Sequence, residues 1–173
     1  LFVLALFFSC SSNSSSDDST NVAPASLLMS GNFNGVQMNN MKPAYYPSET
    51  SVVYDADHIR FLWLQGNGAN GTQLNIYIPD SQWAVGTYDL LDHDVYLKPS
   101  SNVWLIENLS TVSSTDVTKG TISITEFNLV TKKIKGTFSF QYNNFMKAGG
   151  PNQGPYQVSN GTFDYNLDDK YFK

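Results

Sequence analysis

The residue types that most often act in catalysis are scarce in this sequence. It has two histidines, His58 and His93, and one cysteine, Cys10. A nucleophilic triad needs a serine held beside a base, and no Gly-X-Ser-X-Gly elbow occurs in the chain. A zinc centre needs three or four converging histidine, cysteine or carboxylate ligands. Two separated histidines do not supply them, so we predict neither kind of site.

Paired carboxylates are the remaining route to hydrolysis. A glycosidase holds two of them roughly 5–10 Å apart, and Glu126 follows Ile122 and Ile124 on what reads as one face of a strand. In the simpler interpretation, which we favour, Glu126 lies at the rim of a sheet and faces solvent or pairs with Lys132 or Lys133. We therefore predict no catalytic residue, and a hydrolase built on Glu126 and an aspartate is the least favoured alternative.

Two short acidic segments carry the hard oxygen ligands that calcium prefers. They are Asp55-Ala56-Asp57 and Asp92-His93-Asp94. Neither has the spacing of an EF-hand, and aspartate-rich turns are usually only turns. We predict no metal site and no cofactor, and calcium binding at these loops stays open.

Aromatic residues offer a binding site instead. Tyr45 and Tyr46 lie in a loop flanked by prolines, and Trp83 precedes a predicted strand. Rings on loops can stack on sugars or apolar ligands at a low cost in conformational entropy. Trp63 and Trp104 fall within predicted strands, where we expect them to be part of the core. The predicted ligand-binding residues are therefore Tyr45, Tyr46 and Trp83, with core packing as the alternative for Trp83.

The elements that position these residues read as strands, because apolar residues recur with period two and no segment keeps a helical period for three turns. Asn34-Gly35 predicts a type I′ hairpin turn, and Asn160-Gly161 predicts a bulge or a turn in the last strand. The segments 110–119 and 143–155 read as irregular. The predicted strands are 27–33, 36–38, 51–54, 58–65, 72–78, 87–91, 95–97, 103–106, 120–127, 134–142 and 156–167.

These strands predict one all-β domain over residues 26–173. Short turns between sequential strands favour a single antiparallel meander. The meander covers its apolar face either by closing as a β-barrel or by folding as a two-sheet β-sandwich, and the sequence leaves both open.

The first residues resemble the end of a bacterial lipoprotein signal. Eight apolar residues (1–8) are too few to span a bilayer, and Ser9 and Cys10 follow them as in a lipobox. We expect residues 1–9 to be a signal peptide, incomplete at its N-terminus, and Cys10 to carry the lipid. An ordinary signal peptide with an incidental cysteine is the alternative.

Residues 10–25 are rich in serine, asparagine and aspartate, and we expect a disordered tether there. Ser16, Asp17 and Asp18 resemble an acidic signal for export of lipoproteins to the cell surface, and Asp18-Ser19-Thr20 resembles an O-glycosylation motif with Ser19 as the acceptor. We therefore expect an outer-membrane lipoprotein that is exposed at the cell surface, or that otherwise faces the periplasm. The net charge of -5 argues against nucleic-acid partners.

One run near the C-terminus is similar to a family signature. GTISITEFNLVTKKIKGTFSF (120–140), VSNGTFDYNL (158–167) and Gly86-Thr87-Tyr88 resemble an uncharacterised family of all-β lipoproteins of Bacteroidota. The resemblance implies an envelope location and an all-β fold, and it implies no catalytic residues.

The sequence favours a non-enzymatic β-domain that binds a ligand or partner at the cell envelope and is held to the membrane by its lipid anchor. A glycan, a small apolar ligand and an envelope protein all remain candidates. A structural or envelope-assembly subunit is the alternative function, and a barrel with an apolar interior would suggest a carrier of small lipophiles.

Overall fold

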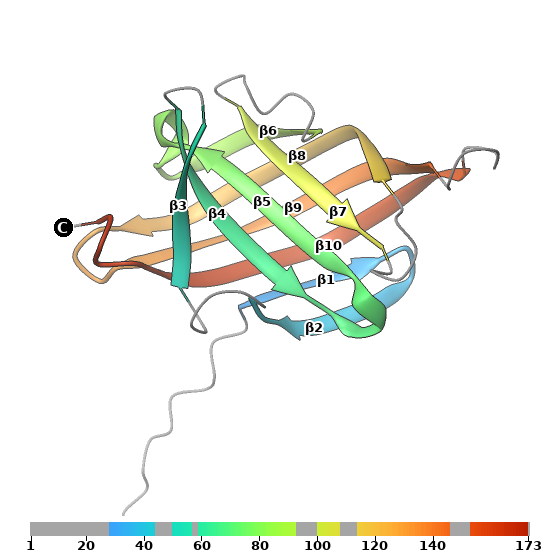
Figure 1. Cartoon of the computed structure of the whole chain (residues 1–173), viewed down its shortest axis with the longest axis horizontal. Helices are drawn as coiled ribbons and strands as arrows, with labels where there is room; N and C mark the ends of the chain where they lie inside the picture. Colours follow the sequence, from blue (N-terminus) through green and yellow to red (C-terminus); the bar gives the residue numbers. More distant parts are fainter. Residues whose placement is uncertain are drawn as a thin grey trace, which may run out of the picture.

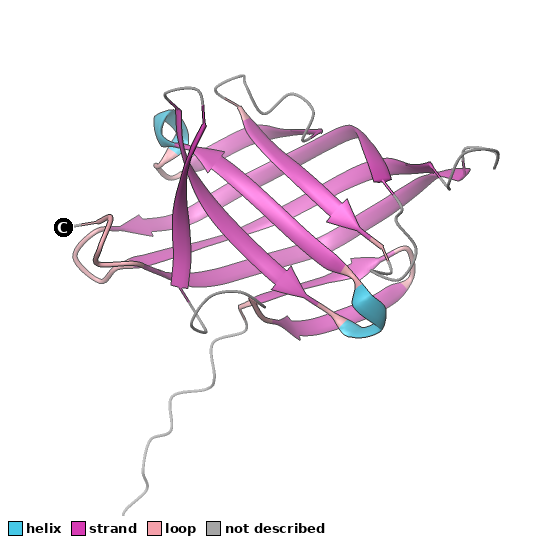
Figure 2. Ribbon diagram, viewed as in Figure 1, coloured by secondary structure: helices cyan, strands magenta, loops and turns pink. Residues whose placement is uncertain are grey.

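The computed structural model describes residues 28–43, 50–56, 59–92, 100–107, 114–145 and 153–172. Strands make up most of them, and two short 3-10 turns, η1 (Ala69–Gly71) and η2 (Asp80–Gln82), stand at the two ends of β5 (Figure 2). The strands are β1 (Met29–Phe33), β2 (Val36–Met41), β3 (Thr50–Ala56), β4 (Ile59–Asn67), β5 (Gln73–Pro79), β6 (Gly86–Asp92), β7 (Ser101–Ile106), β8 (Ser114–Asn128), β9 (Lys133–Phe145) and β10 (Gln153–Leu167). The all-β fold class is confirmed.

Local turn chemistry produces the hairpins. Asn34 and Gly35 both have positive φ angles, 47° and 88°, as the type I′ turn between β1 and β2 requires. Asn128 closes the turn between β8 and β9, because its side-chain oxygen accepts hydrogen bonds from the backbone N–H groups of Val130 and Thr131. The bulge predicted at Asn160 is also present, since the pairing of β10 with β9 shifts between Val158 and Gly161.

The strand pairings form a closed circuit in the order β10-β3-β4-β5-β7-β6-β8-β9-β10, and the β1–β2 hairpin is attached to β10. A front sheet of β3, β4, β5 and β7 crosses a back sheet of β6, β8, β9 and β10 (Figure 1). Short parallel ladders, β10 with β3 and β6 with β7, join the two sheets. The fold therefore departs from a simple antiparallel meander at these two junctions, and it has the two packed layers of a sandwich with the joined edges of a barrel.

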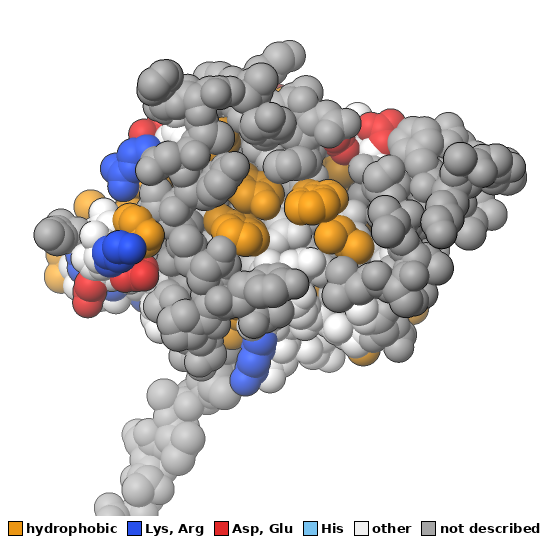
Figure 3. Space-filling model, in the orientation of Figure 1, with side chains coloured by type: hydrophobic (Ala, Val, Ile, Leu, Met, Phe, Trp, Pro, Cys, Tyr) orange, Lys and Arg blue, Asp and Glu red, His pale blue; other side chains and the backbone are white. Residues whose placement is uncertain are grey.

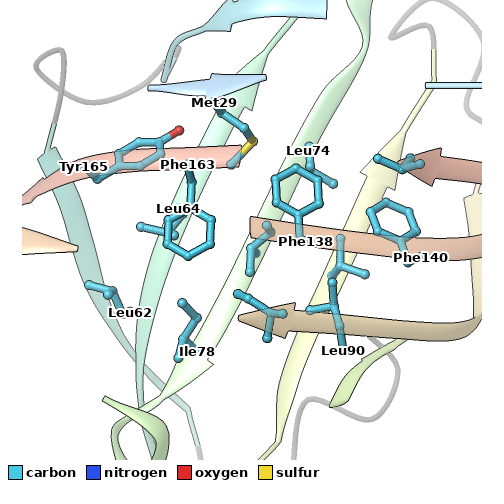
Figure 4. Packing of buried hydrophobic residues seen from close by; sticks show 14 of the residues in the cluster. Met29, Leu62, Leu64, Leu74, Ile78, Leu90, Phe138, Phe140, Phe163 and Tyr165 are labelled. Carbon is cyan, nitrogen blue, oxygen red and sulfur yellow. The ribbon is translucent and has the colours of Figure 1, made fainter. Parts of the chain in front are cut away.

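Alternate side chains of both sheets point into the space between them. Leu62 and Leu64 of β4 face Phe138 and Phe163 of the back sheet (Figure 4). Each buried side chain of this kind stabilises the fold by about 1.5–3 kcal/mol. These side chains occupy the space between the two sheets.

Two glycines let the rings approach the backbone. A Cβ atom at Gly136 would lie 2.2 Å from the carbonyl oxygen of Ser123 and 2.4 Å from Cζ of Phe163. A Cβ atom at Gly161 would lie 2.4 Å from the ring of Phe138. Such distances are far inside van der Waals contact, so these positions require glycine.

Two buried tyrosines carry polar groups into the core. The hydroxyl of Tyr142 donates a hydrogen bond to Glu107, and that of Tyr165 donates to the backbone oxygen of Gln65 at 2.6 Å. The second bond ties the back sheet to β4 of the front sheet. Burial raises the pKa of both phenols, and the hydrogen bond to Glu107 raises that of Tyr142 further.

Some predicted element boundaries were wrong. β8 begins at Ser114, inside the segment expected to be irregular, and β9 and β10 extend into the predicted loop 143–155. The backbone ladder continues there through polar pairs such as Asp116 with Asn143, because ladder hydrogen bonds do not depend on apolar side chains. The predicted strand 95–97 lies outside the described residues.

Candidate functional site

The outer side of the front sheet carries large aromatic and amide side chains. On β5, Leu74, Ile76 and Ile78 belong to the core, so the residues between them point outward. The same alternation applies to β4 and β7. We call the following set the aromatic-amide face: Trp63, Gln65 and Asn67 of β4, Gln73, Asn75 and Tyr77 of β5, and Asn102 and Trp104 of β7.

Strand register arranges this face in rows. Trp63, Tyr77 and Asn102 form one row, because Trp63 is paired with Tyr77 and Tyr77 with Asn102. The next row holds Gln65, Asn75 and Trp104. A further row begins with Asn67 and Gln73. Rows two residues apart on a strand are separated by about 7 Å.

Two of the rows contain aromatic rings. The rings of Trp63 and Tyr77 are stacked, with centroids 5.7 Å apart and an interplanar angle of 18°. Trp104 exposes 40% of its surface, which is high for so large an apolar side chain. Hydrophobic side chains gather in the middle of this side of the molecule, over β4, β5 and β7 (Figure 3).

Buried amides hold the rings in place. The side-chain oxygen of Asn75 accepts hydrogen bonds from the indole N–H of Trp63 at 3.0 Å and from the amide of Gln65 at 3.1 Å. Asn75 in turn donates to the backbone oxygen of Trp104 at 3.4 Å. Asn75 therefore links all three strands and orients the Trp63 ring.

Gln73 differs from the other amides. It is only 7% exposed, yet its side chain makes no hydrogen bond to any residue in the described part of the chain. A buried amide without a partner costs about 1–3 kcal/mol. Such a group in a folded protein requires an explanation, and a polar ligand is one.

The aromatic-amide face carries no charged side chain. Lys42 is the cation that the strand pairing brings to its margin, because its backbone forms a bridge with Asn67. The side chain of Lys42 is exposed. The face can therefore stack on a flat apolar surface and hydrogen-bond to neutral polar groups, and among the described residues Lys42 places a cation at one end of it.

Trp83, predicted as a binding residue, lies elsewhere. Its indole N–H donates to the backbone oxygen of Ile78 at 2.9 Å, and its ring packs on Phe172, 5.0 Å away, against the core. The guanidinium of Arg60 lies 5.2 Å from the ring centroid. These contacts fit the packing alternative for Trp83.

The other predicted sites lie outside the described residues. They are the lipidation site Cys10, the export signal Ser16, Asp17 and Asp18, the acceptor Ser19, and the loop tyrosines Tyr45 and Tyr46. They remain predictions.

The expectation that Trp104 is a core residue was wrong, and Trp63 also lies outside the core cluster. Both sides of the front sheet carry large side chains, so hydrophobicity alone does not show which side is inside. The polar residues Gln73 and Asn75, which alternate with the apolar residues of β5, were the signal that this side faces outward.

Two carboxylates of the back sheet, Glu126 and Asp164, are engaged in ion pairs. Glu126 lies 3.5 Å from Lys135, and Asp164 lies 3.0 Å from Lys133 and 3.5 Å from Lys135. The pKa of Lys135 is raised by Asp164 and, to a lesser extent, by Glu126. Glu126 thus takes the rim position expected of it, although its partner is Lys135 rather than Lys132 or Lys133. A bulge after Ile124 brings Phe127 to the core side in place of Glu126.

Of the two acidic segments, only Asp92 has a described side chain. It accepts a hydrogen bond from the backbone N–H of Val117 at 2.8 Å, which joins β6 to β8. Within the described ranges, no three histidine, cysteine, aspartate or glutamate side chains come together as a metal site. Nor does that part of the chain form a helix of the length and hydrophobicity that crossing a membrane requires.

Comparison with known proteins gives no relative for this chain: no protein-family model, curated protein or solved structure matches it.

Proposed function

We propose that this chain is a lipid-anchored, non-enzymatic protein of the cell envelope whose β-domain binds a glycan on the aromatic-amide face. The observation that carries the proposal is the exposed ring of Trp104 beside the stacked pair of Trp63 and Tyr77, with amides between them. A lipid anchor at Cys10 and a polar tether would hold this face outside the membrane.

The chemistry of the face fits a sugar better than it fits a purely apolar ligand. A pyranose ring has an apolar face of C–H groups and a rim of hydroxyl groups. Aromatic side chains supply area for the first, and side-chain amides both donate to and accept from the second. A small apolar ligand would leave the buried amide of Gln73 without a polar partner.

A non-enzymatic role is supported by the ion pairs of two carboxylates that the structure describes. Glu126 and Asp164, on the outer side of the back sheet, both pair with Lys135. Neither belongs to the aromatic-amide face, which holds no acid or base for bond cleavage.

A glycan array tests the proposal. The full chain, carrying Cys10→Ser so that it stays unlipidated, is compared with the same chain carrying Trp104→Ala. We expect Trp104→Ala to weaken binding at least tenfold, because truncating a central tryptophan costs about 2 kcal/mol or more.

Val130→Ala is the matched control, since Val130 is 92% exposed in the turn between β8 and β9. It should leave binding unchanged. Binding that survives Trp104→Ala, or the absence of any glycan bound by the parent chain, contradicts the proposal. An envelope protein captured through Trp104 would favour the envelope-assembly alternative.

A further inference from the structure

We infer that the ligand of the aromatic-amide face is an uncharged glycan chain of at least two sugar units, and that Gln73 is a specificity-determining residue that binds its hydroxyl groups. This inference rests on the proposed glycan-binding function and goes further, because it names the charge and the length of the ligand.

The absence of charge on the face selects against acidic sugars. None of its eight residues is a lysine, arginine, aspartate or glutamate. A sugar carboxylate or sulfate placed there would lose its water without gaining a cation, which is strongly unfavourable. Neutral hydroxyl groups can exchange water for the side-chain amides at little cost.

The spacing of the rings selects a chain over a single sugar. Trp63 and Trp104, the two half-buried or exposed rings of the face, lie two strands apart in rows two residues apart. With strands about 4.8 Å apart and rows about 7 Å apart, their backbones are separated by about 12 Å. This separation exceeds the width of one pyranose ring, so a ligand that stacks on both rings spans more than one unit.

Gln73 supplies the polar contact. It lies on β5, two residues from Asn75 and on the same side of the sheet. Among the amides of the face, that of Gln73 is the one without a hydrogen-bond partner within the described structure. A primary amide can accept from one hydroxyl group and donate to the next. A neutral sugar beside Trp104 would thus satisfy a group that the fold leaves unsatisfied.

Lys42 makes the charge inference testable, because it stands at the margin of the face, beside Asn67. If acidic glycans were the ligands, Lys42 would be the described cation that is placed to hold them. Lys42→Gln therefore separates the two classes of glycan without touching the aromatic rows.

The experiment is affinity electrophoresis of the full, unlipidated chain in native gels that contain one polymer each. The two polymers of each pair share one backbone, and only one of them carries carboxylates: hydroxyethyl cellulose is compared with carboxymethyl cellulose, and methyl-esterified with de-esterified homogalacturonan. Fragments of the retarding polymer, from one sugar unit upward, are then titrated by calorimetry. The variants are Gln73→Leu, Lys42→Gln and, as the matched control, Gln141→Leu on the exposed side of the back sheet.

We expect retardation by a neutral polymer and not by its acidic counterpart, with affinity rising at least tenfold from one sugar unit to three. Gln73→Leu should weaken binding about three- to tenfold, the loss expected for one hydrogen bond, whereas Lys42→Gln and Gln141→Leu should not change it. Binding of the acidic polymers that is lost in Lys42→Gln overturns this inference and leaves the glycan-binding function standing. Full affinity for a single sugar unit overturns the length. If no glycan binds in the gels or on the array, both proposals fail.

Discussion

Replacing Gln73 by leucine should stabilise the protein, whereas the same change at Gln65 should destabilise it. Both glutamines are buried on the outer side of the front sheet, on neighbouring strands. Gln65 donates to Asn75 at 3.1 Å and accepts from Asn67 at 3.4 Å, while the Gln73 side chain has no hydrogen-bond partner in the described structure. The two substitutions thus remove the same amide group, which is hydrogen-bonded at Gln65 and has no hydrogen bond at Gln73.

The magnitudes follow from that difference. Removing an unsatisfied buried amide relieves about 1–3 kcal/mol, and leucine loses up to about 1 kcal/mol less side-chain entropy than glutamine on burial. We expect Gln73→Leu to raise the free energy of unfolding by about 1–3 kcal/mol. Gln65→Leu should lower it by about 1–2 kcal/mol, because satisfied hydrogen bonds are lost.

Urea denaturation followed by tryptophan fluorescence measures both changes in the free energy of unfolding. In thermal unfolding, each kcal/mol should shift the melting temperature by about 2–4 °C in a domain of roughly this size. Gln141→Leu, at an exposed position, should stay within about 0.5 kcal/mol of the parent. If Gln73→Leu destabilises the chain as much as Gln65→Leu does, Gln73 is already satisfied in the free protein and the reasoning is refuted.

Two further predictions concern the core. Gly136→Ala should destabilise the fold by about 1–3 kcal/mol or more, because the new Cβ would lie 2.2 Å from the carbonyl oxygen of Ser123. A urea midpoint equal to that of the parent chain would contradict this, since it would show that β9 can shift away from β8. Burial and Glu107 raise the pKa of Tyr142 above its value of about 10 in the unfolded chain. The neutral phenol therefore stabilises the fold fully below pH 10 or so, and this contribution is lost as the pH rises toward the pKa of the folded state. Stability should therefore fall above pH 10 or so, and the fall should be shallower in Tyr142→Phe; equal slopes in the two chains would contradict the assignment.

Local features of the fold were predictable from the sequence. The hairpin turn at Asn34-Gly35 and the bulge at Asn160-Gly161 follow from residues that tolerate positive φ angles. The alternation around Ile134 and Phe138 identified β9, because a half-buried antiparallel strand has period two.

Long-range features were not predictable in the same way. The insertion of β7 between β5 and β6, and the return of β3 to the edge of β10, depend on pairings between distant segments. No local pattern encodes them. The polar extensions of β8, β9 and β10 were missed because backbone ladders there continue without apolar side chains.

The candidate site was missed for a related reason. Trp63 and Trp104 lie in strands, and large rings in strands usually belong to the core. Their outward position follows from the pairing of three strands, which places them beside Asn75 rather than beside Leu64 or Ile76. The residues of the face were visible in the sequence, but their convergence was not.

The most direct test of glycan binding on the aromatic-amide face uses the three tryptophans of the chain, each of which gives one indole N–H signal in a nitrogen-15 NMR spectrum. Trp63 and Trp104 belong to the face, whereas Trp83 packs on Phe172 against the core and serves as the internal control. When the neutral oligosaccharide selected on the array is added, the signals of Trp104 and Trp63 should shift and that of Trp83 should stay in place. A shift of Trp83 alone, or no shift of any indole signal while the sugar binds, would contradict the account.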